Sequence, residues 1–177
     1  MLSIIFLSGC TNQTDDRPLV TISADWVSYA TFDEMANDAT DIVRAEILSS
    51  TVKIWRIGYG DLPHIVYTIR ILEVFQGDLQ VGDEIEMEQL GGESDYMVII
   101  NPNKIPIEIG DDLILFLLNR DPSTPAGILH QGVYRLSKEI DSIEEIDASI
   151  ELISVVDDEG WIEIEITVED LWDLEEN

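Results

Sequence analysis

The sequence predicts a mainly β protein with flanking helices and at least five strands. Isoleucine is frequent and lysine is nearly absent, a bias that favours strands over helices. Residues 84–90, EIEMEQL, alternate between glutamate and uncharged side chains, as a half-exposed strand does. Residues 113–118, LILFLL, are apolar on both faces and predict the most buried strand. With 177 residues, of which 45% are apolar, the chain can form one domain with a substantial core.

A short helix is expected before the strands, over residues 31–41. Thr31 can accept a hydrogen bond from the backbone three residues further on, and Glu34 can reach back, which is the capping-box pattern. Phe32, Met35 and Ala36 would then face the core.

Residues 41–55 and 64–77 predict the first two strands. The second has mixed faces, which is typical of a curved strand or of one covered on both sides. Between them, GYGDLP at residues 58–63 is rich in glycine and proline and predicts a turn. A compact connection with two Gly-Asp pairs then leads to the strand at 84–90.

A long irregular segment, residues 93–112, is expected to separate these three strands from the last two. It follows two consecutive glycines, which allow a bend or a positive φ. The buried strand at 113–118 comes next, and a loop leads to a final strand at 128–136 that a glycine interrupts.

Residues 139–177 differ in character, because they carry 16 acidic and no basic side chains. A set of isoleucines at near-helical spacing predicts an amphipathic helix with an acidic outer face. These isoleucines are Ile140, Ile143, Ile146 or Ile150, and Ile153. Residues 161–167 alternate as an exposed strand would, and Thr167 is a suitable N-cap for a last helix with an acidic first turn.

The net charge of −28 is the strongest global feature of the chain. A protein this acidic repels phosphate backbones, so nucleic acid is not an expected partner. It also lacks the basic face that docks on anionic lipid headgroups. Two interpretations remain: a surface for divalent cations or a basic partner, and the commoner one, a solvated acidic surface.

Cys10 is the only cysteine, so no intramolecular disulfide can form. It ends the series Leu7, Ser8, Gly9, Cys10, which fits the bacterial lipobox of an aliphatic residue, a small residue, Gly or Ala, and Cys. A short apolar run precedes the motif and a polar stretch follows it, as in a signal peptide and a tether. Cleavage after Gly9 would leave Cys10 as the N-terminus, carrying a diacylglycerol thioether.

Two acyl chains would hold the protein stably at the extracytoplasmic face of the cell membrane. The apolar run is short and has no basic residue before it, which indicates a start further upstream or missing first residues. No stretch of about 20 apolar residues follows Cys10, so no internal transmembrane helix is expected. The competing interpretation is a chance match near the terminus.

No catalytic signature is present, since HExxH, CxxC, GxSxG and EF-hand spacings are all absent. His64 and His130 have no strong partner in the linear sequence, and a structural role is favoured over a metal-binding or general-base role. The pair Asp111–Asp112 and residues 157–159 have oxygen ligands suited to Ca²⁺, but a turn and a solvated loop are the simpler interpretations. We therefore predict no catalytic residue, no metal and no cofactor.

The strand and turn segments resemble those of a type of bacterial secreted protein with an OB-like, netrin-module-like barrel. Tissue inhibitors of metalloproteinases share this architecture. The segments that carry the resemblance, within residues 32–137, are DIVRAEILSS, YTIRILEVFQGDLQVGDEIEM, LGG, GDDLILFLL and QGVYRL. The resemblance implies an antiparallel, OB-like, partly open barrel of five or more strands. Tissue inhibitors chelate a protease zinc through a free N-terminal cysteine, whereas Cys10 would be lipidated, so inhibition by that mechanism is not expected.

These features divide the chain into four parts. They are a signal-peptide remnant (1–9), the lipidated Cys10 with a polar tether (10–19), the OB-like barrel (20–138) and an acidic C-terminal extension (139–177). The expected function is that of a lipid-anchored cell-surface binding or interaction protein without a catalytic site. Its partners would be the membrane, through Cys10, and a basic envelope protein or divalent cations. The alternative is a secreted enzyme, or an inhibitor of an extracellular hydrolase, with a histidine near a carboxylate in a cleft of the barrel.

Overall fold

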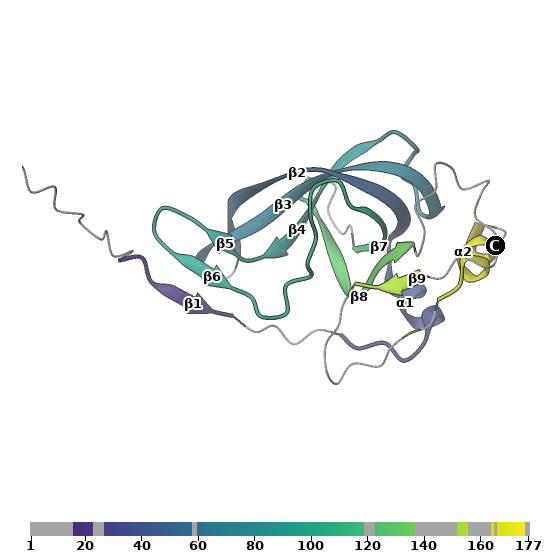
Figure 1. Cartoon of the computed structure of the whole chain (residues 1–177), viewed down its shortest axis with the longest axis horizontal. Coiled ribbons are helices and arrows are strands. Elements are labelled where there is room, and N and C mark those ends of the chain that lie inside the picture. The colour runs from purple at the N-terminus through teal and green to yellow at the C-terminus, as the bar shows by residue number, and fades with distance from the viewer. Residues whose placement is uncertain are drawn as a thin grey trace, which may run out of the picture.

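The computed structural model describes residues 16–22, 27–57, 60–118, 123–136, 152–155, 164 and 166–175. Within these residues, five strands follow one another around a ring (Figure 1). They are β2 (Asp41–Ile57), β3 (Gly60–Gln76), β4 (Glu84–Leu90), β7 (Asp112–Leu118) and β8 (Ala126–Leu136). Their antiparallel order is β4-β3-β2-β7-β8, and β4 meets β8 in a parallel pairing of only two residue pairs. This short contact closes the ring incompletely, which confirms the predicted mainly β, OB-like, partly open barrel.

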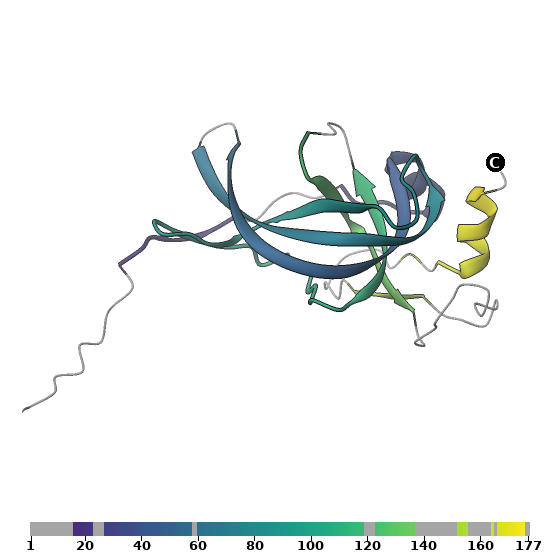
Figure 2. The same ribbon diagram turned by 90° about the horizontal axis from the view of Figure 1, so that it is seen from above.

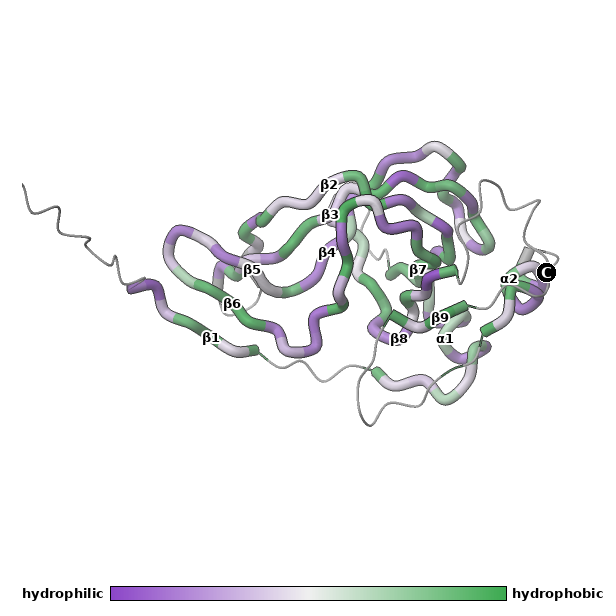
Figure 3. Tube along the Cα trace, viewed as in Figure 1, coloured by the Kyte–Doolittle hydropathy of each residue, from purple (hydrophilic) through white to green (hydrophobic). Residues whose placement is uncertain are grey.

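A second, three-stranded sheet extends from one side of the barrel (Figures 1 and 2). Its strands are β1 (Leu19–Thr21), β5 (Gly92–Glu93) and β6 (Val98–Ile100), in the order β1-β6-β5. β1 and β6 are short apolar segments that pair in parallel (Figure 3). The segment at 93–112 is therefore less irregular than predicted, because its short strand β6 is specified by pairing with residues about 80 positions away.

The turn between β2 and β3 is also shorter than the sequence predicts. Ile57 pairs with Gly60 and Ile54 with Pro63, so most of GYGDLP belongs to β3. Gly91 and Gly92 have φ values of +133° and +120°, so of the two conformations that the glycines allow, a bend or a positive φ, both residues adopt the positive φ.

Buried strand β7 separates two parts of the core. Leu113 to Leu117 are all fully buried, which confirms the prediction for this strand. Leu113, Leu115 and Leu117 face the cluster inside the barrel, whereas Ile114 and Phe116 belong to the cluster beneath the helices. Alternation along a doubly covered strand accounts for this division.

Helix α1 (Phe32–Asp38) begins as predicted, with Thr31 as its N-cap. The Glu34 amide donates to Thr31 Oγ1 at 3.3 Å, while the Glu34 carboxylate accepts from the Ala30 amide, one residue before the cap. Met35 and Ala36 are buried, and the half-buried Phe32 packs edge-on against Phe116. The capped helix thus covers one open side of the core.

The described part of the acidic tail also belongs to the core. β9 (Leu152–Ser154) pairs with β8, so Ile153 lies in a strand rather than in the expected helix. The other isoleucines proposed for that helix lie outside the described residues. Ile164 and Ile166 are buried beside helix α2 (Val168–Glu175), which Thr167 caps by accepting from the Asp170 amide. The tail therefore packs against the barrel, which its composition alone did not show.

Among the described residues, no helix has the length and apolar character needed to cross a membrane.

Gly77, at the end of β3, provides a test of the β3–β4 connection. Its φ is +106°, and a Cβ atom there would lie 2.1 Å from Oδ1 of Asp41. Asp41 is buried, which raises the pKa of its carboxyl, and its Oδ1 accepts from the Asp78 amide at 3.2 Å. We expect Gly77→Ala to lower the free energy of unfolding in urea denaturation by about 1–2 kcal/mol more than Gly82→Ala, because both variants carry the strain of a positive φ but only Gly77→Ala displaces Asp41. Gly82→Ala is the control, since Gly82 also has a positive φ but nothing within 4 Å; an equal loss there would contradict a role for Asp41.

Candidate functional site

A cavity of about 230 Å³ lies where β4 and β8 separate beyond their parallel pairing at Met87–Ala126 and Glu88–Gly127. Its apolar walls are formed by Leu90, Ile105, Leu118 and Ile128. The polar side chains that line it include His64, Glu88 and His130. The incomplete closure of the barrel thus creates an apolar cavity with a few polar groups, which is the usual character of a ligand site.

His64 and Glu88 reach the cavity from adjacent strands. In the β3–β4 pairing, His64 lies opposite Leu90 and Val66 lies opposite Glu88, so His64 and Glu88 are diagonal neighbours on one face. The His64 Nδ1 atom lies 3.2 Å from Glu88 Oε2, and the two side chains are 5% and 24% exposed. A carboxylate is therefore in contact with a buried imidazole at the edge of the cavity.

Three buried polar atoms of this pair lack hydrogen bonds within the described part of the protein. Neither ring nitrogen of His64 makes one, and nor does the buried Oε2 of Glu88, whose contact with Nδ1 has the distance but not the angle of a hydrogen bond. Buried polar atoms are nearly always hydrogen-bonded, because leaving them unsatisfied costs about 1–3 kcal/mol each. These atoms are therefore available to a group that enters the cavity.

A bulge in β8 brings His130 to the same cavity. Leu115 pairs with Val133 and Leu117 with Ile128, so four residues of β8 lie opposite the single residue Phe116. Gly132 ends this bulge, where a Cβ atom would lie 2.5 Å from the Cβ of Phe116. Bulges re-aim side chains in this way, and His130 is 4% exposed at the cavity wall.

Two amide side chains hold the remaining wall in place. Gln89 Oε1 accepts from the Ile105 amide at 2.8 Å, and its Nε2 donates to the Ile105 carbonyl and to Tyr67 Oη. Burial raises the pKa of the Tyr67 hydroxyl, so it stays protonated at neutral pH. Asn101 donates to the Leu90 carbonyl and accepts from the Asn103 amide. Because these amides are engaged, His64 and Glu88 are the groups that remain for a ligand.

No protein-family model and no curated protein matches the chain.

A second cavity of about 300 Å³ has Trp55, Glu84 and Glu86 in its lining. Lys53 Nζ contacts both oxygens of Glu86 at 2.5 and 2.6 Å and lies 5.9 Å from the centre of the Trp55 ring. Since Glu86 is already paired with Lys53, this cavity is a weaker candidate than the one at His64.

The acidic pair considered for Ca²⁺ is engaged by arginines instead. Asp111 accepts from Arg135 at 2.7 Å, and Asp112 accepts from Arg44. Across the described residues, no group of three or more His, Cys, Asp or Glu side chains is arranged to hold a metal ion. Residues 157–159 lie outside the description, as do Cys10 and the lipobox residues Leu7, Ser8 and Gly9.

The linear sequence did not identify Glu88 as a site residue, and it treated the two histidines as unrelated. The strict alternation of residues 84–90 predicted that Glu84 and Glu88 share a solvent-exposed face of the strand. This prediction is correct for Glu84, which is exposed. At Glu88, however, that face is partly covered where β8 approaches β4. The register of the β3–β4 hairpin was the one signal that would have placed His64 beside it.

Proposed function

We propose that the protein is a lipid-anchored, cell-surface binding protein that takes a small ligand in the cavity between β3, β4 and β8. The observation that carries this proposal is His64, a buried imidazole that lines the cavity with both ring nitrogens lacking a hydrogen bond to a described residue. A bound ligand would satisfy these atoms and the neighbouring Glu88 Oε2.

The lipid anchor is proposed from the lipobox at Cys10 and from the secreted, netrin-module-like proteins that the strand pattern resembles. The first described residues lie soon after that motif in the sequence: Arg17 donates to the Ser94 carbonyl at 2.6 Å and pairs with Glu93, and β1 begins at Leu19. Lipidation of Cys10 would hold the barrel within a few nanometres of the membrane. The acidic surface supports a basic envelope protein or divalent cations as further partners.

A ligand screen by thermal unfolding tests the binding function. Small molecules that bind the cavity are expected to raise the Tm of the full chain and to leave the Tm of His64→Leu unchanged, because this variant replaces the unsatisfied ring by an apolar side chain. Glu108→Gln is the control, because Glu108 is exposed and lines neither cavity, and it should respond like the wild type. The absence of any His64-dependent shift across a broad library would contradict the proposal.

Mass spectrometry of the membrane fraction tests the anchor. Wild-type protein is expected to carry the lipid on Cys10 and to sediment with membranes, whereas Cys10→Ala should remain unprocessed and unmodified. Wild-type protein that is unprocessed and free of lipid would contradict the anchor while leaving the binding proposal in place.

A second candidate is a secreted enzyme or hydrolase inhibitor. The 3.2 Å contact between His64 and Glu88 favours it, because a carboxylate beside an imidazole is the arrangement of a general base. Among the described residues that line the cavity there is no serine, threonine or cysteine, so a nucleophilic mechanism has less support than binding. Hydrolysis of chromogenic esters, amides or glycosides that is lost in both His64→Gln and Glu88→Gln would favour the enzyme.

A further inference from the structure

We infer that the cavity at His64 selects small amphipathic amines, with a protonated amino group on a compact apolar body. This inference rests on the proposed binding function and names the chemical class of its ligand.

The charge of the lining is the first reason. Glu88 brings a carboxylate to the cavity, and its buried Oε2 lacks a hydrogen-bond donor. An ionised carboxylate accepts hydrogen bonds and cannot donate them, so it requires a donor. None of the described lining residues is Lys or Arg, and only a protonated histidine would add positive charge. The described lining therefore has no permanently positive side chain that would pair with an anionic ligand.

His64 and Glu88 can both contact a protonated amino group. A neutral His64 ring offers one nitrogen as an acceptor, close to the Glu88 carboxylate. An ammonium group has several donors and can contact both groups at once. Charge-assisted hydrogen bonds of this kind are about twice as strong as neutral ones.

The size and the walls define the rest of the ligand. The volume of about 230 Å³ corresponds to about eight water molecules at ~30 Å³ each. Leu90, Ile105, Leu118 and Ile128 present hydrocarbon to this space. A ring or a short branched chain beside the amino group would displace water from these walls without leaving polar atoms unpaired.

The electrostatic field of the whole protein also favours a cationic ligand. The net charge of −28 raises the local concentration of cations and lowers that of anions around the barrel. Carboxylates and phosphates are therefore disfavoured both at long range and by Glu88 at contact.

Three probes with one carbon skeleton test the inference: benzylammonium, benzyl alcohol and benzoate, titrated into the full-length protein by isothermal calorimetry near neutral pH. Benzylammonium is expected to bind at least about tenfold more tightly than benzoate, with benzyl alcohol between them. In Glu88→Gln, which keeps the shape of the side chain, the preference for the amine over the alcohol should disappear.

Glu108→Gln is the matched control, because it removes the same charge from an exposed side chain that lines neither cavity. The control should keep the preference, since long-range charge alone is screened by salt. Circular dichroism and the Tm establish that both variants are folded. Loss of the preference in both variants would overturn a local role of Glu88.

Three results would overturn the choice of ligand class. They are equal or tighter binding of the alcohol or the benzoate, no binding of the amine, and Zn²⁺ binding that depends on His64 and Glu88 in place of the amine. If the alcohol or the benzoate binds equally or more tightly in a His64-dependent way, the ligand class is wrong but the proposed binding function is still supported. Failure of the ligand class can therefore be distinguished from failure of the binding function. The binding function itself fails only when the broader thermal screen also finds no His64-dependent ligand.

Discussion

Removal of residues 164–177 is expected to abolish the cooperative unfolding transition of the barrel. Ile164, Ile166, Val168 and Leu171 are at most 8% exposed and belong to the core cluster that includes Phe116 and Tyr134. Burial of each such side chain contributes about 1.5–3 kcal/mol, so their joint loss is of the order of the whole stability of a domain. Urea denaturation followed by circular dichroism and by ANS binding measures the effect.

A point variant keeps this prediction testable when the truncated chain is not produced. Leu171→Ala should lower the free energy of unfolding by about 2–4 kcal/mol, because Leu171 is 1% exposed. Glu169→Ala, on the exposed face of the same helix, should cost less than about 1 kcal/mol. A truncated barrel with a sharp, wild-type-like transition would show that α2 is an appendage.

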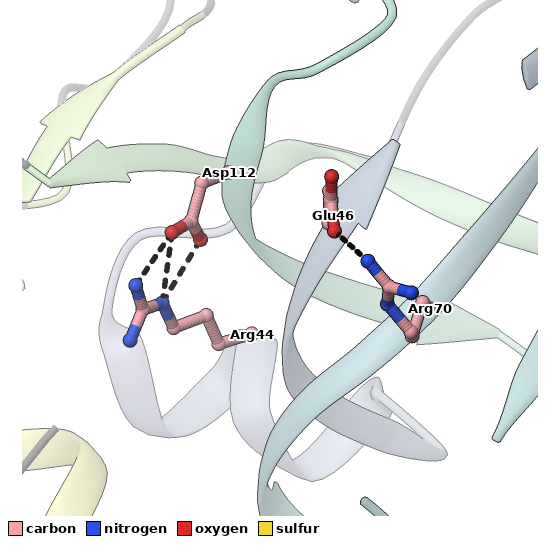
Figure 4. A network of polar contacts seen from close by, with 4 residues as sticks. All are labelled: Arg44, Glu46, Arg70 and Asp112. Carbon is pink, nitrogen blue, oxygen red and sulfur yellow. Dashed lines mark hydrogen bonds and ion pairs between the residues drawn. The ribbon is translucent and has the colours of Figure 1, made fainter. Parts of the chain in front are cut away.

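The second large effect is expected at the ion pair between β2 and β7. Arg44 has a side chain that is only 6% exposed, and Asp112 accepts from its Nε at 2.9 Å and from Nη2 at 2.5 Å (Figure 4). This carboxylate raises the pKa of the guanidinium, so Arg44 remains charged. Asp112→Asn would leave a buried cation without its main partner.

We expect Asp112→Asn to lower the free energy of unfolding by about 3 kcal/mol. This lies at the lower end of the range for breaking a buried pair, because Asp112 itself is 38% exposed and Glu73 lies near enough to favour the charge on Arg44. Denaturant unfolding at neutral pH gives the value.

The neighbouring pair Arg70–Glu46 is the matched control for this prediction (Figure 4). It has the same chemistry, but its side chains are 44% and 36% exposed. Glu46→Gln should therefore cost less than about 1 kcal/mol. Equal losses in Asp112→Asn and Glu46→Gln would show that burial of Arg44 does not decide the energetics of the pair.

Local patterns predicted the parts of the fold that depend on near neighbours. The caps at Thr31 and Thr167 involve residues three positions apart, and the alternation of β4 involves residues two apart, so both were readable in the chain. The short strands β1 and β6 were missed, because three residues carry little periodicity and their stability comes from each other.

The acidic tail is a second case in which local sequence patterns did not predict a contact between distant residues. Its composition marked residues 139–177 as different in character but left open whether they pack on the barrel. Its described apolar residues belong to the core cluster that also contains Met35 and Ala36 of α1. Charge on one face of a segment says nothing about where its apolar face is buried, which depends on a partner distant in sequence. The lipobox at Cys10, by contrast, stays a prediction from sequence.

The sequence by itself determined the β class, the central buried strand and the positions of the helix caps, because side-chain period and capping are local properties. Only the tertiary structure decided that His64, Glu88 and His130 share one cavity. That arrangement requires the register of β3 on β4, the brief parallel contact of β4 with β8 and the bulge opposite Phe116. Each of these is a pairing between distant residues, set by packing of the whole barrel rather than by any neighbouring stretch of chain.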